Sequence, residues 1–131
     1  MQNLTALGDA QTHRPRAFVL EDDVHTQRLL TELIASRGVE PVAFTRISSA
    51  RRALSGRLPM FMVVDDDLPD GKGTELVREL LDDPRTRGLR ILFCTAAEPA
   101  RRREMSRLAP VIAKPFRLRD MERALSEVVS H

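Results

Sequence analysis

Short apolar runs alternate along this chain with stretches in which apolar residues recur every three or four positions. An apolar run bounded by polar residues is typical of a buried strand, and the wider spacing is typical of one face of a helix. We therefore expect strands at residues 17–21, 39–44, 60–65, 89–94 and 111–113. We expect helices around residues 29–34, 48–58, 76–81, 99–107 and 121–129.

Regular alternation of strands and helices predicts a parallel sheet covered by helices on both faces. The expected fold class is α/β, a single doubly wound (βα)5 domain with three layers. Pro41 lies inside the second strand and lacks a backbone N–H, which places that strand at an edge of the sheet. Gly38 suits the end of the first helix, and Ser48 or Ser49 suits the start of the second.

A chain of 131 residues is long enough to bury one core. We expect residues 1–15 to be a flexible lead-in and residues 16–131 to be the domain. The 21 basic and 19 acidic residues leave a net charge of +2, which is too small to indicate a polyanionic partner. The chain has no Trp or Tyr to stack on bases, and we interpret the arginines of residues 101–103 as a solvated helix face.

The composition also bears on the cellular compartment. Cys94 is the only cysteine, which excludes an internal disulfide, and its apolar neighbours indicate a small core residue. No apolar run approaches the roughly 20 residues that a membrane span requires. The first 16 residues lack the apolar stretch of a signal peptide. We expect a cytoplasmic protein with no membrane partner.

Polar residues stand where the expected strands end. The first strand ends at Glu21 and Asp22, the third at Asp65, the fourth at Thr95 and the fifth at Lys114. The carboxyl ends of parallel strands meet at one edge of the sheet, so these side chains are expected to converge. Carboxylate oxygens suit Mg²⁺, and a hydroxyl and an ammonium suit the oxygens of a phosphoryl group. The sequence therefore predicts phosphoryl-transfer chemistry at this edge.

Four motifs give the chain a specific resemblance: FVLEDD (residues 18–23), VVDDDLPDGKG (residues 63–73), ILFCTAA (residues 91–97) and AKPF (residues 113–116). In this order and at this spacing they resemble the receiver domain of two-component response regulators. The likeness extends over about residues 16–130. It implies a flavodoxin-like three-layer sandwich with a five-stranded parallel sheet, as in single-domain, CheY-like receivers.

The resemblance implies a role for each residue at the strand ends. Asp65 would be the phosphoacceptor, taking a phosphoryl group from the phosphohistidine of a sensor histidine kinase or a phosphotransfer protein. Thr95 and Lys114 would contact the phosphoryl oxygens. Such a protein catalyses only its own phosphorylation and dephosphorylation, and it signals by binding a downstream protein partner.

The resemblance also implies a metal site. Asp22 and Asp65 would ligate Mg²⁺ directly, together with the backbone carbonyl of Asp67, and Glu21 would help to hold the ion. The Lys114–Pro115 peptide bond would be cis. The resemblance gives no role to three further acids, which we interpret as solvated loop residues: Asp23, Asp66 and Asp70.

The chain departs from the family pattern in two respects. Val111 stands where the family usually has Tyr or Phe, so a rotating ring cannot report phosphorylation. The stretch from Thr95 to Lys114 is about three residues shorter than is common, which predicts a short fourth helix. Both departures affect the surface through which family members commonly dimerise, so a homodimer remains only one possible assembly.

Two other classes of function are compatible with parts of this pattern. A phosphatase of the haloacid dehalogenase class also carries an Asp-x-Asp pair, here Asp65 and Asp67, but its metal-binding acids follow the Lys instead of preceding the nucleophile. A pseudo-receiver would bind a partner without being phosphorylated. No stretch resembles a helix-turn-helix, so direct nucleic-acid binding is not expected, and no output domain is expected within residues 1–131.

Overall fold

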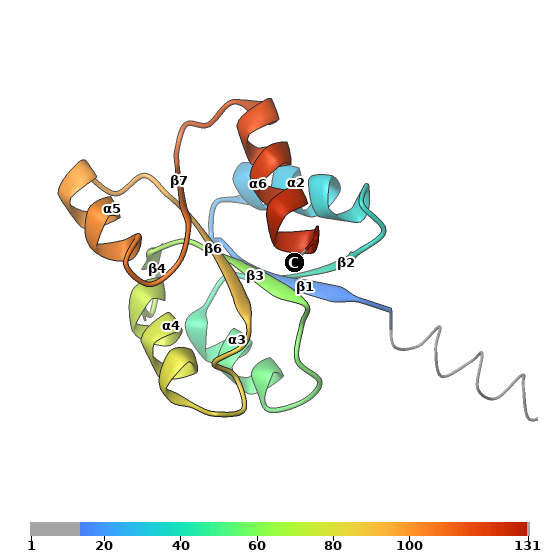
Figure 1. Ribbon diagram of the computed structural model, residues 1–131, viewed down its shortest axis with the longest axis vertical. Coiled ribbons are helices and arrows are strands. Elements are labelled where there is room, and N and C mark those ends of the chain that lie inside the picture. Colours follow the sequence, from blue (N-terminus) through green and yellow to red (C-terminus); the bar gives the residue numbers. More distant parts are fainter. Residues whose placement is uncertain (1–13, 131) are drawn as a thin grey trace, which may run out of the picture.

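The computed structural model describes residues 14–130, which form a five-stranded parallel sheet with helices on both faces (Figure 1). The strands follow the order β2-β1-β3-β6-β7. Their bounds are Arg16–Leu20 for β1, Glu40–Phe44 for β2, Phe61–Val64 for β3, Arg90–Thr95 for β6 and Val111–Ala113 for β7. β2 lies at an edge of the sheet, as Pro41 predicted. The winding reverses between β1 and β3, and in such folds the functional site lies at the carboxyl ends of the strands.

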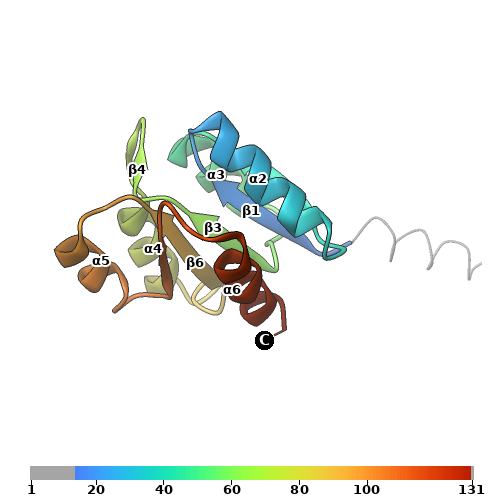
Figure 2. The same cartoon turned by 90° about the horizontal axis from the view of Figure 1, so that it is seen from above.

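The described residues contain five helices, arranged in two layers. Their bounds are Val24–Ala35 for α2, Ile47–Leu54 for α3, Gly73–Asp82 for α4, Pro99–Met105 for α5 and Leu118–Ser130 for α6. Helices α2 and α6 cover one face of the sheet, whereas α3 and α4 cover the other, with α5 beside β7 (Figures 1 and 2). This is the doubly wound (βα)5 fold that the alternation of strands and helices predicted.

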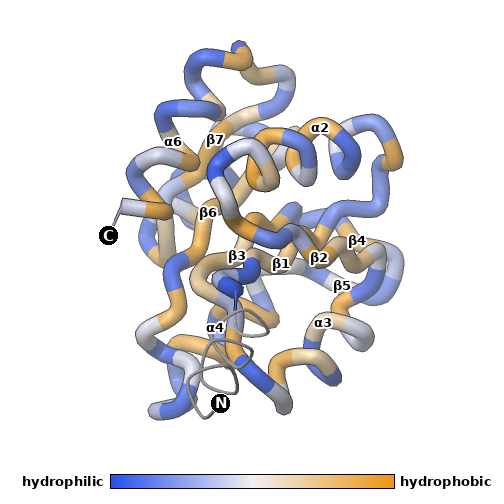
Figure 3. The backbone as a smooth tube through the Cα atoms, turned by 90° about the vertical axis from the view of Figure 1, so that its right-hand side faces the viewer, coloured by the Kyte–Doolittle hydropathy of each residue, from blue (hydrophilic) through white to orange (hydrophobic). Residues whose placement is uncertain are grey.

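The sheet separates two hydrophobic clusters because successive side chains of a strand point to opposite faces. In β1, Phe18 and Leu20 pack with residues of α3 and α4, whereas Ala17 and Val19 pack with residues of α2 and α6. Strands buried on both faces are apolar at every position rather than at every second one. Figure 3 shows the result as hydrophobic segments in the centre of the molecule and hydrophilic segments on its loops.

The starts and ends of the helices test the predicted caps. Gly38 follows α2 with a φ of 78°, the left-handed conformation that glycine adopts readily, and this prediction is confirmed. The prediction that Ser48 or Ser49 caps the next helix is wrong. Helix α3 begins at Ile47, and the carboxylate of Asp70 accepts hydrogen bonds from the backbone N–H groups of Ile47 (2.8 Å) and Ser48 (3.0 Å). The cap therefore comes from a distant loop instead of the helix's own first turn.

A small antiparallel hairpin, formed by β4 (Asp67–Leu68) and β5 (Gly71–Lys72), was not predicted. Strands of two residues carry no periodicity that a sequence pattern can reveal. Gly71 has a φ of 149°, a conformation that residues with a side chain rarely adopt. The hairpin projects beside α4 in Figure 2 and carries Asp70 toward α3.

The expected flexible lead-in falls mostly on residues 1–13, which lie outside the described residues, as does His131. Arg14 and Pro15 are described, and both contact the domain. The carbonyl of Pro15 accepts the N–H of Glu40 at 2.8 Å, and that of Arg14 accepts a guanidinium N–H of Arg57 at 3.1 Å. Among residues 14–130, no helix has the length and apolar character to cross a membrane.

Candidate functional site

The parallel ladder brings the predicted site residues to one edge of the sheet. Beyond the paired strands, the N–H of Asp65 donates to the carbonyl of Leu20 at 3.0 Å, and the N–H of Lys114 donates to that of Thr95 at 2.8 Å. The N–H of Glu21 likewise donates to the carbonyl of Phe44 at 3.0 Å. The first residues after β1, β3 and β7 are thus fixed by backbone hydrogen bonds, so their side chains start from rigid positions.

Three carboxylates and one ammonium form the core of the site. Glu21, Asp22 and Asp65 offer carboxylate oxygens that all lie within 4.8 Å of one another. The Nζ of Lys114 donates to Glu21 Oε1 at 2.5 Å and to Asp65 Oδ2 at 3.0 Å. Glu21 and Asp65 are buried, at 1% and 7% exposure, whereas Asp22 is exposed at the rim. The structure therefore brings together four of the predicted site residues.

Burial shapes the charges of this cluster. Burial raises the pKa of Glu21, and the hydrogen bond from Lys114 offsets this only in part. For Lys114, burial acts to lower the pKa, but the bonds to Glu21 and Asp65 outweigh burial, and the pKa is raised. Lys114 is therefore a cation at neutral pH. Three carboxylates against one ammonium leave two negative charges, which a single Mg²⁺ would neutralise.

The carboxylate of Asp65 is oriented from both sides. Its Oδ1 accepts the backbone N–H of Asp66 at 2.7 Å and, more weakly, that of Asp67 at 3.4 Å, while Oδ2 accepts Lys114. The backbone of Asp65 is held equally closely, because a Cβ added at Gly73 would lie 2.0 Å from the Asp65 carbonyl oxygen. Only glycine allows helix α4 to begin this near to Asp65.

Two further predicted site residues, Thr95 and Asp67, have other side-chain partners. The hydroxyl of Thr95 is fully buried at the end of β6 and accepts the N–H of Ala97 at 3.1 Å. The side chain of Asp67 is exposed and forms an ion pair with Lys72 across the hairpin. The Lys114–Pro115 peptide bond is cis, as the resemblance implied.

The interpretation of Asp66 as a solvated loop acid is wrong. Its carboxylate is buried and receives hydrogen bonds from Thr74 and from Arg101, for which the sequence predicted a solvated helix face. Burial acts to raise the pKa of Asp66, but these bonds outweigh it and the pKa is lowered.

The other two unassigned acids are exposed, as expected, but each has a structural role. Asp23 caps α2 through hydrogen bonds from the backbone N–H of Thr26 (2.9 Å) and from its hydroxyl (2.7 Å). Asp70 caps α3. Cys94 is buried, and desolvation raises the pKa of its thiol to about 12, so it is an inert core residue as predicted.

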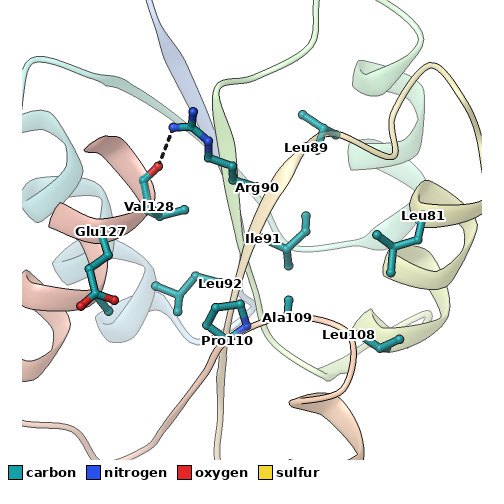
Figure 4. A pocket seen from close by; sticks show the side chains of 11 residues that line it. Leu81, Leu89, Arg90, Ile91, Leu92, Leu108, Ala109, Pro110, Glu127 and Val128 are labelled. Atoms are coloured by element: carbon teal, nitrogen blue, oxygen red, sulfur yellow. Dashed lines mark hydrogen bonds between the residues drawn. The ribbon is translucent and has the colours of Figure 1, made fainter. Parts of the chain in front are cut away.

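An apolar cavity of about 610 Å³ lies at the opposite end of the sheet. Figure 4 shows it between α4, the start of β6 and α6, with Pro110 and Ala109 forming part of its wall. Arg90 borders it and donates to the carbonyl of Val128 at 3.1 Å. The cavity is separate from the carboxylate cluster, since β6 runs from this cavity to Thr95.

The chain matches the family described as the response regulator receiver domain over residues 17–126. This match spans most of the chain, and the chain belongs to that family.

Relatives support the family assignment. The chain is 34% identical over 82 residues to the phosphate regulon transcriptional regulatory protein PhoB of Rhizobium meliloti (strain 1021). That alignment covers 63% of this chain and 36% of the relative, so the chain spans well under half of the relative's length.

Solved structures show the same fold. A sensor protein from Polaromonas sp. JS666 is 30% identical, with a TM-score of 0.75 over 89% of this chain and 97% of that one. The non-phosphorylated HemR receiver domain of Leptospira biflexa is 28% identical, with a TM-score of 0.77 over 90% and 96%. The receiver domain of a sensor histidine kinase from Pseudomonas aeruginosa PAO1, which has a magnesium ion coordinated in its active site cleft, is 21% identical with a TM-score of 0.78 over 90% and 99%.

Proposed function

We propose that Asp65 accepts a phosphoryl group from the phosphohistidine of a sensor histidine kinase or a phosphotransfer protein. The setting of the Asp65 carboxylate carries this proposal. One oxygen accepts the backbone N–H of Asp66 and the other accepts the ammonium of Lys114, while two further carboxylates stand beside it. A carboxylate that is buried, oriented and surrounded by groups for a cation and for a phosphoryl group has the equipment for phosphoryl transfer.

The proposed transfer is a displacement at phosphorus. A carboxylate oxygen of Asp65 forms the new O–P bond as the N–P bond of the donor breaks. The electron pair of that bond goes to the imidazole nitrogen, and the ring, protonated at its other nitrogen, leaves as neutral imidazole. The rigid backbone of Asp65 contributes by holding the attacking oxygen in one place.

Mg²⁺ is the metal that the donor set fits. Asp22, Asp65 and the backbone carbonyl of Asp67 would hold it, with Glu21 assisting from the buried side. The ion would neutralise the cluster and the incoming phosphoryl oxygens. The magnesium ion in the active site cleft of the Pseudomonas aeruginosa receiver supports this assignment by similarity of fold.

Lys114 and Thr95 would stabilise the phosphorylated form. Once Asp65 is phosphorylated, its carboxylate charge is gone, and the ammonium of Lys114 can donate to a phosphoryl oxygen instead. The Thr95 hydroxyl would supply a second donor after leaving the N–H of Ala97. The chemistry is confined to the protein's own phosphorylation and dephosphorylation, and output is the binding of a downstream protein in the cytoplasm.

The test is an intact-mass measurement after incubation with Mg²⁺ and acetyl phosphate. We expect the protein to gain one phosphoryl group, and we expect no gain with EDTA or in Asp65→Asn. Asp82→Asn is the matched control, because Asp82 is an exposed aspartate at the end of α4, and it should behave like the unaltered protein.

Two outcomes would contradict the proposal. Equal labelling of Asp65→Asn would place the acceptor elsewhere. If neither acetyl phosphate nor any histidine kinase tried labels the unaltered protein, the chain is a pseudo-receiver that binds its partner without phosphorylation.

A further inference from the structure

The carboxylate of Asp66 is the most heavily bonded buried charge outside the carboxylate cluster in residues 14–130. Its side chain is 2% exposed. Oδ1 accepts the backbone N–H of Thr74 at 3.2 Å and the Thr74 hydroxyl at 2.9 Å. Arg101 supplies two more bonds, from Nε to Oδ2 at 2.9 Å and from a terminal guanidinium nitrogen to Oδ1 at 3.2 Å. Both oxygens are therefore engaged by the fork of one arginine.

Arg101 comes from α5 and binds both Asp66 and its other partner, Thr74. Its guanidinium also donates to the hydroxyl of Thr74 at 2.6 Å and to Glu104 at 3.3 Å. The arginine side chain is 29% exposed, so it enters the domain from the surface. Asp66, Thr74 and Arg101 thus join the end of β3, the first turn of α4 and helix α5 at one point.

The backbone of Asp66 connects this network to the phosphoacceptor. Its N–H donates to Asp65 Oδ1 at 2.7 Å, and its carbonyl accepts the N–H of Gly73 at 2.9 Å. The same residue therefore binds Arg101 with its side chain and orients Asp65 with its main chain. If Arg101 were lost, the Asp66 carboxylate would keep only its bonds from Thr74, and the peptide that carries this N–H would be held less firmly.

We propose, on the basis of the proposed function, that Arg101 is a positioning residue for phosphoryl transfer. By holding the Asp66 carboxylate, it fixes the peptide N–H that orients the acceptor oxygen of Asp65. Arg101 does not touch the reacting atoms, and its effect passes through Asp66. Loss of a fixed attack geometry lowers the rate of a displacement without changing its chemistry.

A purely stabilising ion pair is the alternative, and it predicts different behaviour. Buried ion pairs can often be replaced by apolar residues of similar volume without loss of stability. If the pair only stabilises the fold, any variant that recovers stability also recovers the rate. If the pair positions Asp65, a variant can recover its stability while its labelling rate stays low.

The experiment compares Arg101→Met, Arg101→Lys and the double variant Asp66→Leu/Arg101→Met with the unaltered protein. Arg103→Met is the matched control, since Arg103 is an exposed arginine on the same helix. For each protein we would measure the rate of labelling against acetyl phosphate concentration at saturating Mg²⁺, and the thermal midpoint. The amide proton shift of Asp66 reports the hydrogen bond to Asp65 without any phosphorylation.

We expect Arg101→Met to lower the maximal labelling rate about tenfold, with little change in the acetyl phosphate concentration that gives half the maximal rate. The amide proton of Asp66 should shift upfield as its hydrogen bond to Asp65 weakens. The maximal rate of Arg101→Lys should lie between those of Arg101→Met and the unaltered protein, because an ammonium cannot reproduce the bidentate contact. The double variant should recover the midpoint but not the rate, and Arg103→Met should match the unaltered protein. If the double variant does not fold, the single variants measured below their midpoints still decide the question.

An unchanged maximal rate in Arg101→Met would overturn the inference and leave the proposed function standing. If the double variant recovers both the thermal midpoint and the maximal rate, the inference is also overturned and the proposed function stands. Failure of the unaltered protein to be labelled by any donor would instead overturn the proposed function, and the inference would fall with it.

Discussion

Lys114 keeps two buried carboxylates from repelling each other at the end of the sheet. Lysine occurs at only two positions in the sequence, and the other, Lys72, pairs with Asp67 at the hairpin. Lys114 donates to both Glu21 and Asp65. A single ammonium thus offsets one of the three carboxylate charges before any metal binds, and it stands beside the carboxylate of Asp65.

Replacing Lys114 with Met should separate metal binding from phosphorylation. We expect Mg²⁺ to bind at least as tightly, because the competing cation is gone. We expect the labelling rate with acetyl phosphate to fall about a hundredfold, the usual effect of removing a preorganised donor to developing negative charge. Lys72→Met is the control and should retain the rate. Weaker Mg²⁺ binding together with an unaltered rate in Lys114→Met would show that the ammonium serves the metal site instead.

Gly73 should be intolerant of a side chain for reasons of contact alone. A methyl group there would lie 2.0 Å from the carbonyl oxygen of Asp65 and 2.6 Å from a methyl of Val64. We expect Gly73→Ala to lower the free energy of unfolding by about 2–4 kcal/mol, as overpacking of a rigid core does. Urea denaturation measures this.

Gly88→Ala is the matched control for Gly73→Ala. A Cβ added at Gly88 meets no atom within 4 Å, so its effect on unfolding should be small. An equal decrease in the free energy of unfolding in the two variants would show that the start of α4 can shift to make room for a methyl group at Gly73.

At the scale of elements, the hairpin of β4 and β5 supports helix α3. Helix α3 begins at Ile47 without a side-chain cap from its own first turn, and Asp70 supplies the acceptors from the hairpin. Asp70 therefore links the loop after Asp65 to helix α3.

Loss of this cap should lower stability in a manner that depends on pH. Hydrogen bonds from the N–H groups of Ser48 and Ile47 lower the pKa of Asp70 in the folded state. The stabilisation is therefore fully present above the unfolded pKa of about 3.9 and is lost as pH falls through the folded pKa. We expect Asp70→Ala to lower the thermal midpoint at neutral pH. The difference in midpoint between this variant and the unaltered protein should become smaller in acid.

Asp82→Ala serves as the control for the cap. Asp82 lies exposed at the C-terminal end of α4, where a negative charge is unfavourable for the helix, so its removal should not lower the midpoint. A gap for Asp70→Ala that stays constant down to pH 2 would contradict the assignment of the effect to the carboxylate charge.

At the scale of the whole molecule, we expect the carboxylate cluster to couple metal binding to folding. Binding of Mg²⁺ to the folded state alone should stabilise it by about 2.7 kcal/mol at a metal concentration one hundred times the dissociation constant. We expect the thermal midpoint to rise with Mg²⁺ and to return with EDTA. Asp22→Asn should abolish the rise, and Asp120→Asn, in the first turn of α6, should leave it intact. An equal rise in Asp22→Asn would move the metal away from this edge.

The sequence predicted the fold because its signals are local. The apolar runs, the alternating periods and Gly38 each act within a few residues, and strands that end in Glu21, Asp65 and Lys114 must meet at one edge of a parallel sheet. Asp66 and Arg101 are separated by 35 positions in the sequence, and no short-range pattern links them. The same holds for Asp70 and the start of α3, separated by 23 and 22 positions. What sequence reasoning missed are polar contacts between elements, which depend on the packed positions of both partners.

The shortness of α5 has a consequence for hydrogen exchange. The helix has seven residues and a single buried one, Met105, so few contacts oppose its local opening. Its amides should exchange with solvent deuterium well before those of β3, which is buried along its whole length. Arg101 links this helix to Asp66, so phosphorylation of the neighbouring Asp65 should change the exchange of the α5 amides. The rate at which α5 exchanges would then report the state of the acceptor, in a domain where Val111 offers no ring to do so.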